Sequence, residues 1–147
     1  MHADWLIAQW PAPSRVRAVC STRAGGHSSG PYASLNLGAH VGDDPGKVAA
    51  NRAEFTRCLG ARALFLDQVH GLEVANLDAG NTDALQADAA RTTTLGLACT
   101  IMVADCLPVL FCDTQGRQVA AAHAGWRGMA GANGSGILER TCLSMSN

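Results

Sequence analysis

The chain has 147 residues, of which 48% are hydrophobic, and its formal net charge at pH 7 is −1. This length suits a single globular domain with a core of its own, expected over residues 1–147. The balanced charge argues against nucleic acid or an anionic membrane as partner, and no apolar run reaches the length of a membrane span. The first fifteen residues lack the pattern of a secretory signal, so the sequence predicts a cytoplasmic protein.

Six cysteines are spread along the sequence, and most of them lie inside apolar segments. No two have the C-x-x-C spacing of a structural zinc knuckle, and a protein without an export signal is expected to keep its thiols reduced. Most of the six are therefore predicted to be small packing residues.

The first part of the chain predicts a strand, a long loop and a helix. Residues 16–20 have a strand pattern, and residues 27–46 are rich in Gly, Ser, Pro and Asn, as is typical of a long loop that is either functional or disordered. Asp43 or Asp44 can cap a helix that ends at Gly60.

The second part predicts strands and a final helix. Two continuous apolar runs contain β-branched residues, as in strands covered on both faces. The predicted strands are residues 63–71, 71–78, 95–106, 107–113 and 118–124, and the predicted helix is residues 135–145.

A predicted hairpin brings a cysteine close to a histidine. The turn chemistry of DTQGR, residues 113–117, places Cys106 opposite His123 or Ala124. Pro108 cannot donate a ladder hydrogen bond, so the thiol is expected at the rim of the sheet.

A thiol beside an imidazole supports two chemistries. One is a Cys–His nucleophile pair, and the other is zinc binding. His70, at the end of its own predicted strand, is the best third ligand, whereas the remaining histidines lie in the terminus or the loop (His2, His27 and His40). Two His and one Cys leave the fourth position of zinc open, as catalytic zinc does, and a bound water there has a pKa of about 7.

Residues next to these candidates could complete a site or serve the fold alone. Asp105 could act as a base or only bond the backbone at a bend. Arg127 could bind phosphate bidentately or stack on Trp126 at the surface. Gly125 and Gly128 are expected to let the chain turn sharply after the strand. Periodicity alone leaves each of these open, and a histidine taken singly is more often a partly buried structural residue than a ligand.

Several motifs together resemble the YfiH-like laccase-domain family, whose members are described as polyphenol oxidases or purine nucleoside phosphorylases. They are STRAGGHSSGPYASLNLGAHVGDD, NR at 51–52, DQVHG, TIMVADCLPVLF and AAAHAGWRG. The resemblance implies an α/β (α+β) fold of mixed β-sheets layered with helices, similar to a cysteine-hydrolase sandwich. It implies that His70, Cys106 and His123 bind a metal, expected to be Zn²⁺ rather than copper.

The resemblance also implies a reaction. It is phosphorolysis of adenosine, inosine, guanosine and methylthioadenosine, with adenosine deamination as a second activity, in which Cys106, His123 and Asp105 are catalytic. Arg23, Arg52 and Arg127 are the expected phosphate partners and Asn36 a ribose or base partner. The expected partners are thus a nucleoside and phosphate, and a homodimer is compatible with the resemblance.

Alternatives from other classes stay open. The family resemblance includes amide hydrolysis on peptidoglycan precursors, which a Cys–His amidase would perform. Copper-dependent phenol oxidation needs several coppers and many histidines, and five histidines make it a poor match. Family members extend beyond this length, so the domain is expected to be incomplete at its C-terminus, and an inactive metal-binding fragment is a further alternative.

Overall fold

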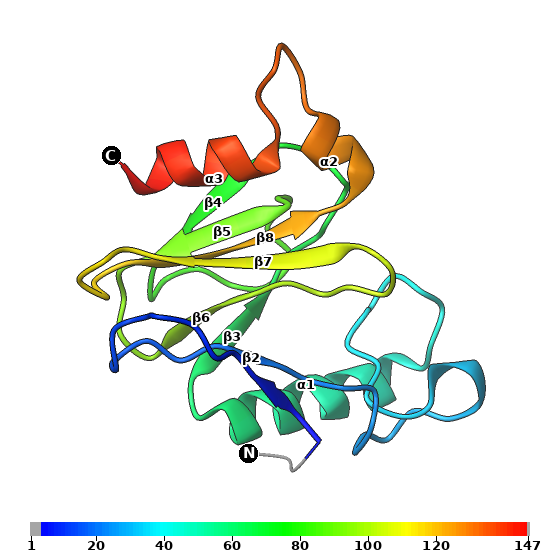
Figure 1. Cartoon of the computed structure of the whole chain (residues 1–147). Helices are drawn as coiled ribbons and strands as arrows, with labels where there is room; N and C mark the ends of the chain where they lie inside the picture. The colour runs from blue at the N-terminus through cyan, green and yellow to red at the C-terminus, as the bar shows by residue number, and fades with distance from the viewer. Residues whose placement is uncertain (1–3, 147) are drawn as a thin grey trace. The chain divides into compact units, whose positions relative to one another are not determined.

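The computed structural model describes residues 4–146 and contains both helices and β-sheets (Figure 1). The chain divides into two compact units. Unit 1 contains residues 4–10 and 17–62, and unit 2 contains residues 11–16 and 63–146 of the described part. Unit 1 holds β1 (Leu6–Ile7), β2 (Val19–Cys20), the 3₁₀ helix η1 (Gly30–Tyr32) and α1 (Pro45–Leu59).

Unit 2 carries most of the strands, with β3 starting at the boundary between the units. Its elements are β3 (Arg62–Phe65), β4 (Val74–Leu77), β5 (Ala89–Thr92), β6 (Leu97–Thr100), β7 (Leu107–Cys112), β8 (Val119–Ala124), α2 (Trp126–Ala130) and α3 (Ile137–Met145). This mixed arrangement confirms the predicted fold class.

The helix of unit 1 begins and ends where the sequence predicted. The Asp44 side chain accepts a hydrogen bond from the Lys47 N–H, and Pro45 stands in the first turn. Gly60 ends the helix with a φ of 70°, a left-handed conformation that glycine adopts without a steric penalty. The predicted strand at 16–20 is shorter, since only Val19–Cys20 pairs, with the short strand β1 that the sequence analysis missed.

One buried side chain organises the long loop of unit 1. Asn51 of α1 is fully buried, and its carbonyl oxygen accepts from the His27 N–H at 2.7 Å. Its amide group donates to the Ser28 hydroxyl and to the backbone oxygens of Ser34 and Asn36. The loop predicted at 27–46 is therefore tied to the helix through its backbone.

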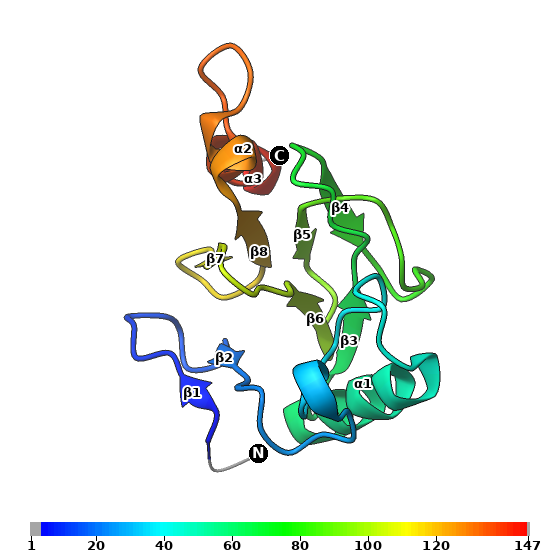
Figure 2. The ribbon, with the colours of Figure 1, turned by 90° about the vertical axis from the view of Figure 1, so that its right-hand side faces the viewer.

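The main sheet of unit 2 has the strand order β4-β5-β8-β7. β4 and β5 are parallel, whereas β5 with β8 and β8 with β7 are antiparallel. Alanines in β5 and β8 let α3 approach closely, and Ala89, Ala122 and Ala124 form one core cluster with Ile137 (Figures 1 and 2). β3 and β6 form a separate pair.

Two of the predicted strands end early. The strand expected over 63–71 ends at Phe65, and the one expected over 95–106 ends at Thr100. The Gln68 side chain replaces strand pairing here, because its amide donates to the Met102 carbonyl and accepts from the Met102 N–H, both at 2.8 Å. An apolar run alone does not distinguish such a segment from a strand.

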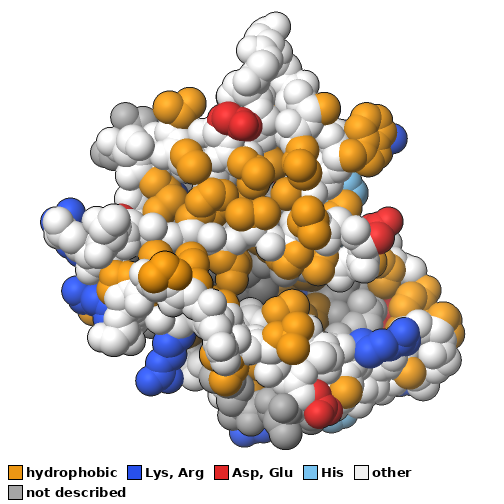
Figure 3. Space-filling view, in the orientation of Figure 1, with side chains coloured by type: hydrophobic (Ala, Val, Ile, Leu, Met, Phe, Trp, Pro, Cys, Tyr) orange, Lys and Arg blue, Asp and Glu red, His pale blue; other side chains and the backbone are white. Residues whose placement is uncertain are grey.

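β7 is also more open than predicted. It lies at the edge of the sheet, and its residues are exposed or half-buried instead of covered on both faces. Apolar side chains gather on the face of the molecule where β7 lies, and Leu107 is 61% exposed (Figure 3).

The hairpin forms, but its register differs from the prediction. Leu107 lies opposite Ala124 and Pro108 opposite His123, so Cys106 comes just before the first paired residue. The predicted pairing of Cys106 with His123 or Ala124 is wrong.

The turn explains the shift of register. The Asp113 side chain accepts from the backbone N–H groups of Arg117 and Gln118, and Gly116 has a φ of 65°. This turn spans the residues between Cys112 and Val119 and is longer than a centred tight turn.

Candidate metal centre

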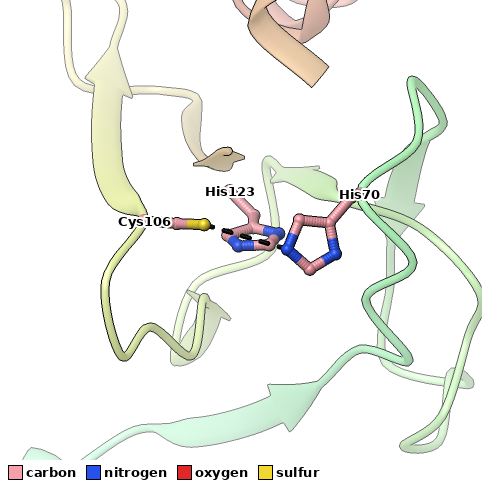
Figure 4. Close-up of side chains that lie close together, drawn as sticks. All are labelled: His70, Cys106 and His123. Atoms are coloured by element: carbon pink, nitrogen blue, oxygen red, sulfur yellow. Dashed lines mark hydrogen bonds between the residues drawn. The ribbon is translucent and has the colours of Figure 1, made fainter. Parts of the chain in front are cut away.

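Three side chains of unit 2 converge at one end of the main sheet. His70 lies in the bend after β3, Cys106 directly precedes β7, and His123 is in β8. Their ligand atoms all lie within 4.8 Å of one another (Figure 4). The Cys106 Sγ is 3.8 Å from the His70 Nε2, and the two imidazole centroids are 4.6 Å apart at an angle of 70°.

The three side chains differ in exposure. His123 is buried, Cys106 is half-buried and His70 is exposed. The structure therefore brings together the three residues that the sequence analysis selected, at a sheet rim that solvent or a substrate can reach.

Glycine at position 125 leaves room for this cluster. A Cβ there would lie 2.9 Å from the His70 Cδ2, closer than real Cβ atoms approach, and 3.1 Å from the Cys106 Sγ, which is tighter than most real contacts. Gly125 joins β8 to α2 with an extended backbone and a φ of −72°, so the predicted turn does not depend on a left-handed glycine conformation. Gly128 lies within α2, where a Cβ would meet the Gly71 carbonyl oxygen at 3.2 Å. Both glycines serve close approach.

A buried carboxylate that the sequence analysis missed supports both histidines. Asp88, directly before β5, is fully buried. Its Oδ1 accepts from the His123 Nδ1 at 2.9 Å and from the His70 N–H at 2.8 Å. Its Oδ2 accepts from the N–H groups of Val69 and Gly71 at 3.1 and 2.7 Å. The sequence did hold a signal for Asp88, because it is the one acidic residue in the alanine-rich stretch ADAA. A charge in an apolar segment needs partners when it is buried.

The surroundings shift the acidity of two groups in opposite directions. Burial on its own raises the pKa of Asp88, but hydrogen bonds from His123 and three backbone amides outweigh it and hold that pKa below its ordinary value. Desolvation raises the pKa of the Cys106 thiol, and the neighbouring carboxylates of Asp105 and Asp88 raise it further. The thiol therefore keeps its proton at neutral pH until a cation replaces it.

Two further predicted residues of unit 2 stand near these ligands in the sequence. Asp105 is exposed, and its carboxylate raises the pKa of the neighbouring Cys106 thiol. Arg127 is exposed in α2, with its guanidinium carbon 4.8 Å from the centroid of the Trp126 ring. The stacking considered in the sequence analysis is thus present.

The other three predicted substrate residues belong to unit 1, where they hold the long loop. Arg23 Nε donates to the Ala33 carbonyl at 2.6 Å, and Arg52 Nε donates to the Leu37 carbonyl at 2.9 Å. The Asn36 side chain bonds to both the N–H and the carbonyl of Gly38 and to Asp43. His27 and His40 are exposed in the same loop, and His2 lies outside the described residues.

The donor set fits a metal ion. Two imidazole nitrogens and one sulfur are the ligands that zinc takes in catalytic sites with an open position. Within residues 4–146, His70, Cys106 and His123 are the one group of three such residues close enough to share a cation. One such group does not supply the several sites of a multi-copper oxidase.

Comparison with known proteins places the chain in a family. Residues 17–147 match the family described as multi-copper polyphenol oxidoreductase laccase. The chain is 55% identical over 141 residues to a purine nucleoside phosphorylase of Pseudomonas aeruginosa, covering 96% of this chain and 56% of that protein. It is 48% identical over 138 residues to the purine nucleoside phosphorylase YfiH of Escherichia coli, covering 92% and 55% respectively.

Solved structures agree with this assignment. A Neisseria meningitidis protein superimposes with a TM-score of 0.88 at 46% identity, covering 98% of this chain and 58% of that one. YlmD from Geobacillus stearothermophilus gives a TM-score of 0.76 at 36% identity, covering 89% and 53%. The chain belongs to the YfiH-like laccase-domain family, as its motifs predicted. It spans just over half the length of these relatives, and among residues 4–146 no helix is long and apolar enough to cross a membrane.

Proposed function

We propose that the protein is a zinc-dependent purine nucleoside phosphorylase with adenosine deamination as a second activity. The observation that carries the proposal is the convergence of His70, Cys106 and His123 in a chain whose relatives are named purine nucleoside phosphorylases. The proposed substrates are inorganic phosphate with adenosine, inosine, guanosine or methylthioadenosine. Phosphorolysis of adenosine would yield adenine and ribose 1-phosphate.

The three ligands would hold Zn²⁺ through nitrogen and sulfur. Asp88 occupies the Nδ1 of His123, so the Nε2 of that ring is the atom left for a cation, and the His70 Nε2 already faces the Cys106 sulfur. When bound, zinc would supply a Lewis acid with one open coordination position.

The chain's own groups would then handle a proton. The raised pKa of Cys106 keeps a proton on Sγ, and this proton must leave when the thiol becomes a ligand. The Asp105 carboxylate, adjacent to Cys106 in the chain and open to solvent, is the acceptor we assign to it.

Arg127 is the proposed phosphate partner. In phosphorolysis a phosphate oxygen bonds to ribose C1′ while the bond from C1′ to the purine nitrogen breaks, so an anion must be held beside the ribose. An exposed guanidinium four positions after His123 supports this role, since it can bind phosphate bidentately. Arg23, Asn36 and Arg52 remain predicted substrate contacts, and their hydrogen bonds within unit 1 give them a structural role as well.

The direct test is product formation. Purified protein, with and without added Zn²⁺, would be incubated with adenosine and phosphate, and adenine and ribose 1-phosphate would be separated by chromatography. Cys106→Ala and His123→Ala should lower turnover at least about 100-fold, since each removes a metal ligand. Cys142→Ala, which removes an exposed thiol from α3, is the matched control and should leave turnover unchanged. Equal turnover in wild type and both site variants would reject the proposal.

A second candidate is a metal-free Cys–His amidase. The 3.8 Å separation of Cys106 Sγ and His70 Nε2 favours it, because a base can take the thiol proton across such a contact. The raised pKa of Cys106 argues against it, because a nucleophilic thiol needs a lowered pKa. Amide hydrolysis that withstands chelators and is lost after alkylation of Cys106 would establish the amidase in place of the phosphorylase.

A further inference from the structure

The carboxylate of Asp88 has its full set of hydrogen-bond partners. Each oxygen accepts twice: Oδ1 from His70 N and His123 Nδ1, and Oδ2 from Val69 N and Gly71 N. An ionised carboxylate only accepts, so all four contacting atoms must be donors. The His123 proton is therefore on Nδ1, and the lone pair of its Nε2 is free.

The same carboxylate fixes the backbone that carries His70. Three successive N–H groups, from Val69 to Gly71, point at Asp88, a concave arrangement that suits an anion. His70 itself has a φ of 60°, which costs a non-glycine residue about 1 kcal/mol or more. The hydrogen bonds to Asp88 offset that cost and hold the ring of His70 beside Cys106.

The backbone of Asp88 also belongs to the support. Its carbonyl accepts from the His123 N–H at 2.7 Å, and its N–H donates to the Glu73 carbonyl at 3.1 Å. Asp88 is thus tied to β8 on one side and to the segment after His70 on the other, and its side chain has little freedom to move.

We propose that Asp88 is the positioning residue of the metal site, a single buried carboxylate that makes both histidines present Nε2 to the same cation. This inference rests on the proposed zinc site and names the group that makes it competent. A carboxylate behind a ligating imidazole is a general device for fixing tautomer and orientation. Here one carboxylate acts on two ligands, through the ring of His123 and through the backbone of His70.

The substitution Asp88→Asn keeps the size of the side chain and removes half of its acceptors. If its NH₂ replaces Oδ1, the His123 Nδ1 must become an acceptor and its proton moves to Nε2, where it blocks the metal. If the NH₂ replaces Oδ2, the amides of Val69 and Gly71 lose their acceptor and the loop of His70 loosens. In either orientation one ligand is disturbed.

The experiment measures zinc affinity by competition with a chromophoric chelator, on protein stripped of metal. Asp88→Asn should bind Zn²⁺ about 10- to 100-fold more weakly than wild type. The matched control is Thr92→Val in β5, the strand that Asp88 directly precedes; it removes a buried hydrogen bond to the Leu77 carbonyl without touching a ligand. Thr92→Val should lose stability but keep wild-type zinc affinity. Equal affinity in wild type and Asp88→Asn overturns the proposal.

A second measurement needs no variant. Long-range ¹H–¹⁵N NMR of the metal-free wild type reports which nitrogen of His123 carries the proton. The proposal requires the Nδ1–H form, and a dominant Nε2–H form overturns it even if Asp88→Asn does not fold. Neither readout uses turnover, so a zinc-loaded wild type that performs no phosphorolysis would reject the proposed function and leave the role of Asp88 standing.

Discussion

Each unit of the molecule uses one fully buried polar side chain to hold a loop, but the two side chains differ in charge. Asn51 in unit 1 donates three hydrogen bonds and accepts one, almost all with the backbone of the long loop. Asp88 in unit 2 only accepts, and one of its donors is the ring of His123. A neutral amide can satisfy a mixture of donors and acceptors, whereas a carboxylate selects donors and so fixes where an imidazole keeps its proton. A buried side chain that holds a loop therefore becomes part of a reactive site once it is charged and contacts a titratable group.

The largest effect is expected from filling the space between the ligands. Gly125→Ala places a methyl group 2.9 Å from the His70 Cδ2 and 3.1 Å from the Cys106 Sγ, so the His70 ring must shift and the sulfur must give way slightly. Zinc affinity should fall at least about 100-fold, as for loss of a ligand, in a chelator-competition titration. Gly80→Ala, at an exposed turn of the same unit, is the control and should bind as wild type. Wild-type affinity in Gly125→Ala would show that the site tolerates a wider spacing.

The difference in charge between Asn51 and Asp88 can be tested by placing a carboxylate at position 51. Asn51→Asp turns three donated hydrogen bonds into contacts between oxygens, and burial then disfavours the charge. We expect about 2–4 kcal/mol less stability to urea unfolding. Zinc affinity of the folded protein should change by less than about twofold, because the contacts of Asn51 lie within unit 1. A fall in the zinc affinity of the folded protein well beyond twofold would show that the loop of unit 1 influences the metal site.

The pH dependence of zinc binding tests whether Cys106 of unit 2 is a ligand. The raised pKa of Cys106 means that its proton is present at neutral pH and must be released when a cation binds. Zinc binding should therefore weaken as the pH falls, by up to about tenfold per pH unit between pH 8 and 6. Titration at three pH values measures the slope, and Cys142→Ala should not alter it. A pH-independent affinity in this range would mean that Cys106 is not a ligand.

Acid should also weaken unit 2 through Asp88. Its folded pKa is lowered, so the stability that it contributes is present above the unfolded pKa of about 3.9 and is lost as the pH falls through the folded pKa. In metal-free protein, the free energy of unfolding of wild type should fall as the pH drops through the folded pKa of Asp88. Asp88→Asn lacks this carboxylate, so its free energy of unfolding should fall less over the same pH range. Unfolding can be followed by circular dichroism. Equal acid sensitivity of the two proteins would exclude Asp88 as its source.

The sequence predicted most of what local chemistry determines. Asp44 and Gly60 mark the ends of α1 because caps are local signals, and the hairpin of β7 and β8 was visible because its turn chemistry is local too. The exact register was not predictable, since Asp113 lengthens the turn through side-chain hydrogen bonds that no pattern specifies.

The site shows the same division. His70, Cys106 and His123 could be selected because thiols and imidazoles at the ends of apolar runs are unusual and matched family motifs. Asp88 could not be selected by the same reasoning, since its partners are backbone amides and a ring that only the fold brings to it. Likewise Gly125 was expected to permit a turn, whereas its role is the empty space beside two ligands, which depends on tertiary structure.

Among these substitutions, Arg127→Ala is expected to change stability least, so it can test phosphate binding without disturbing the fold. Its guanidinium lies over the exposed Trp126 ring, a contact worth about 0.5–1 kcal/mol at such a site. Arg127→Ala should therefore unfold at nearly the wild-type temperature and bind zinc normally.

If Arg127 holds phosphate, the same variant should raise the apparent KM for phosphate about tenfold or more, which corresponds to the loss of a charge-assisted hydrogen bond, and leave the KM for adenosine nearly unchanged. Arg117→Ala is the matched control, because it removes another exposed arginine of unit 2, whose Nε lies 3.6 Å from the Asp113 carboxylate. An unchanged phosphate KM in Arg127→Ala would return this side chain to a stacking role. Arg23 and Arg52 of unit 1 would then be the remaining predicted phosphate partners. Their hydrogen bonds to the loop mean that replacing them should also lower stability.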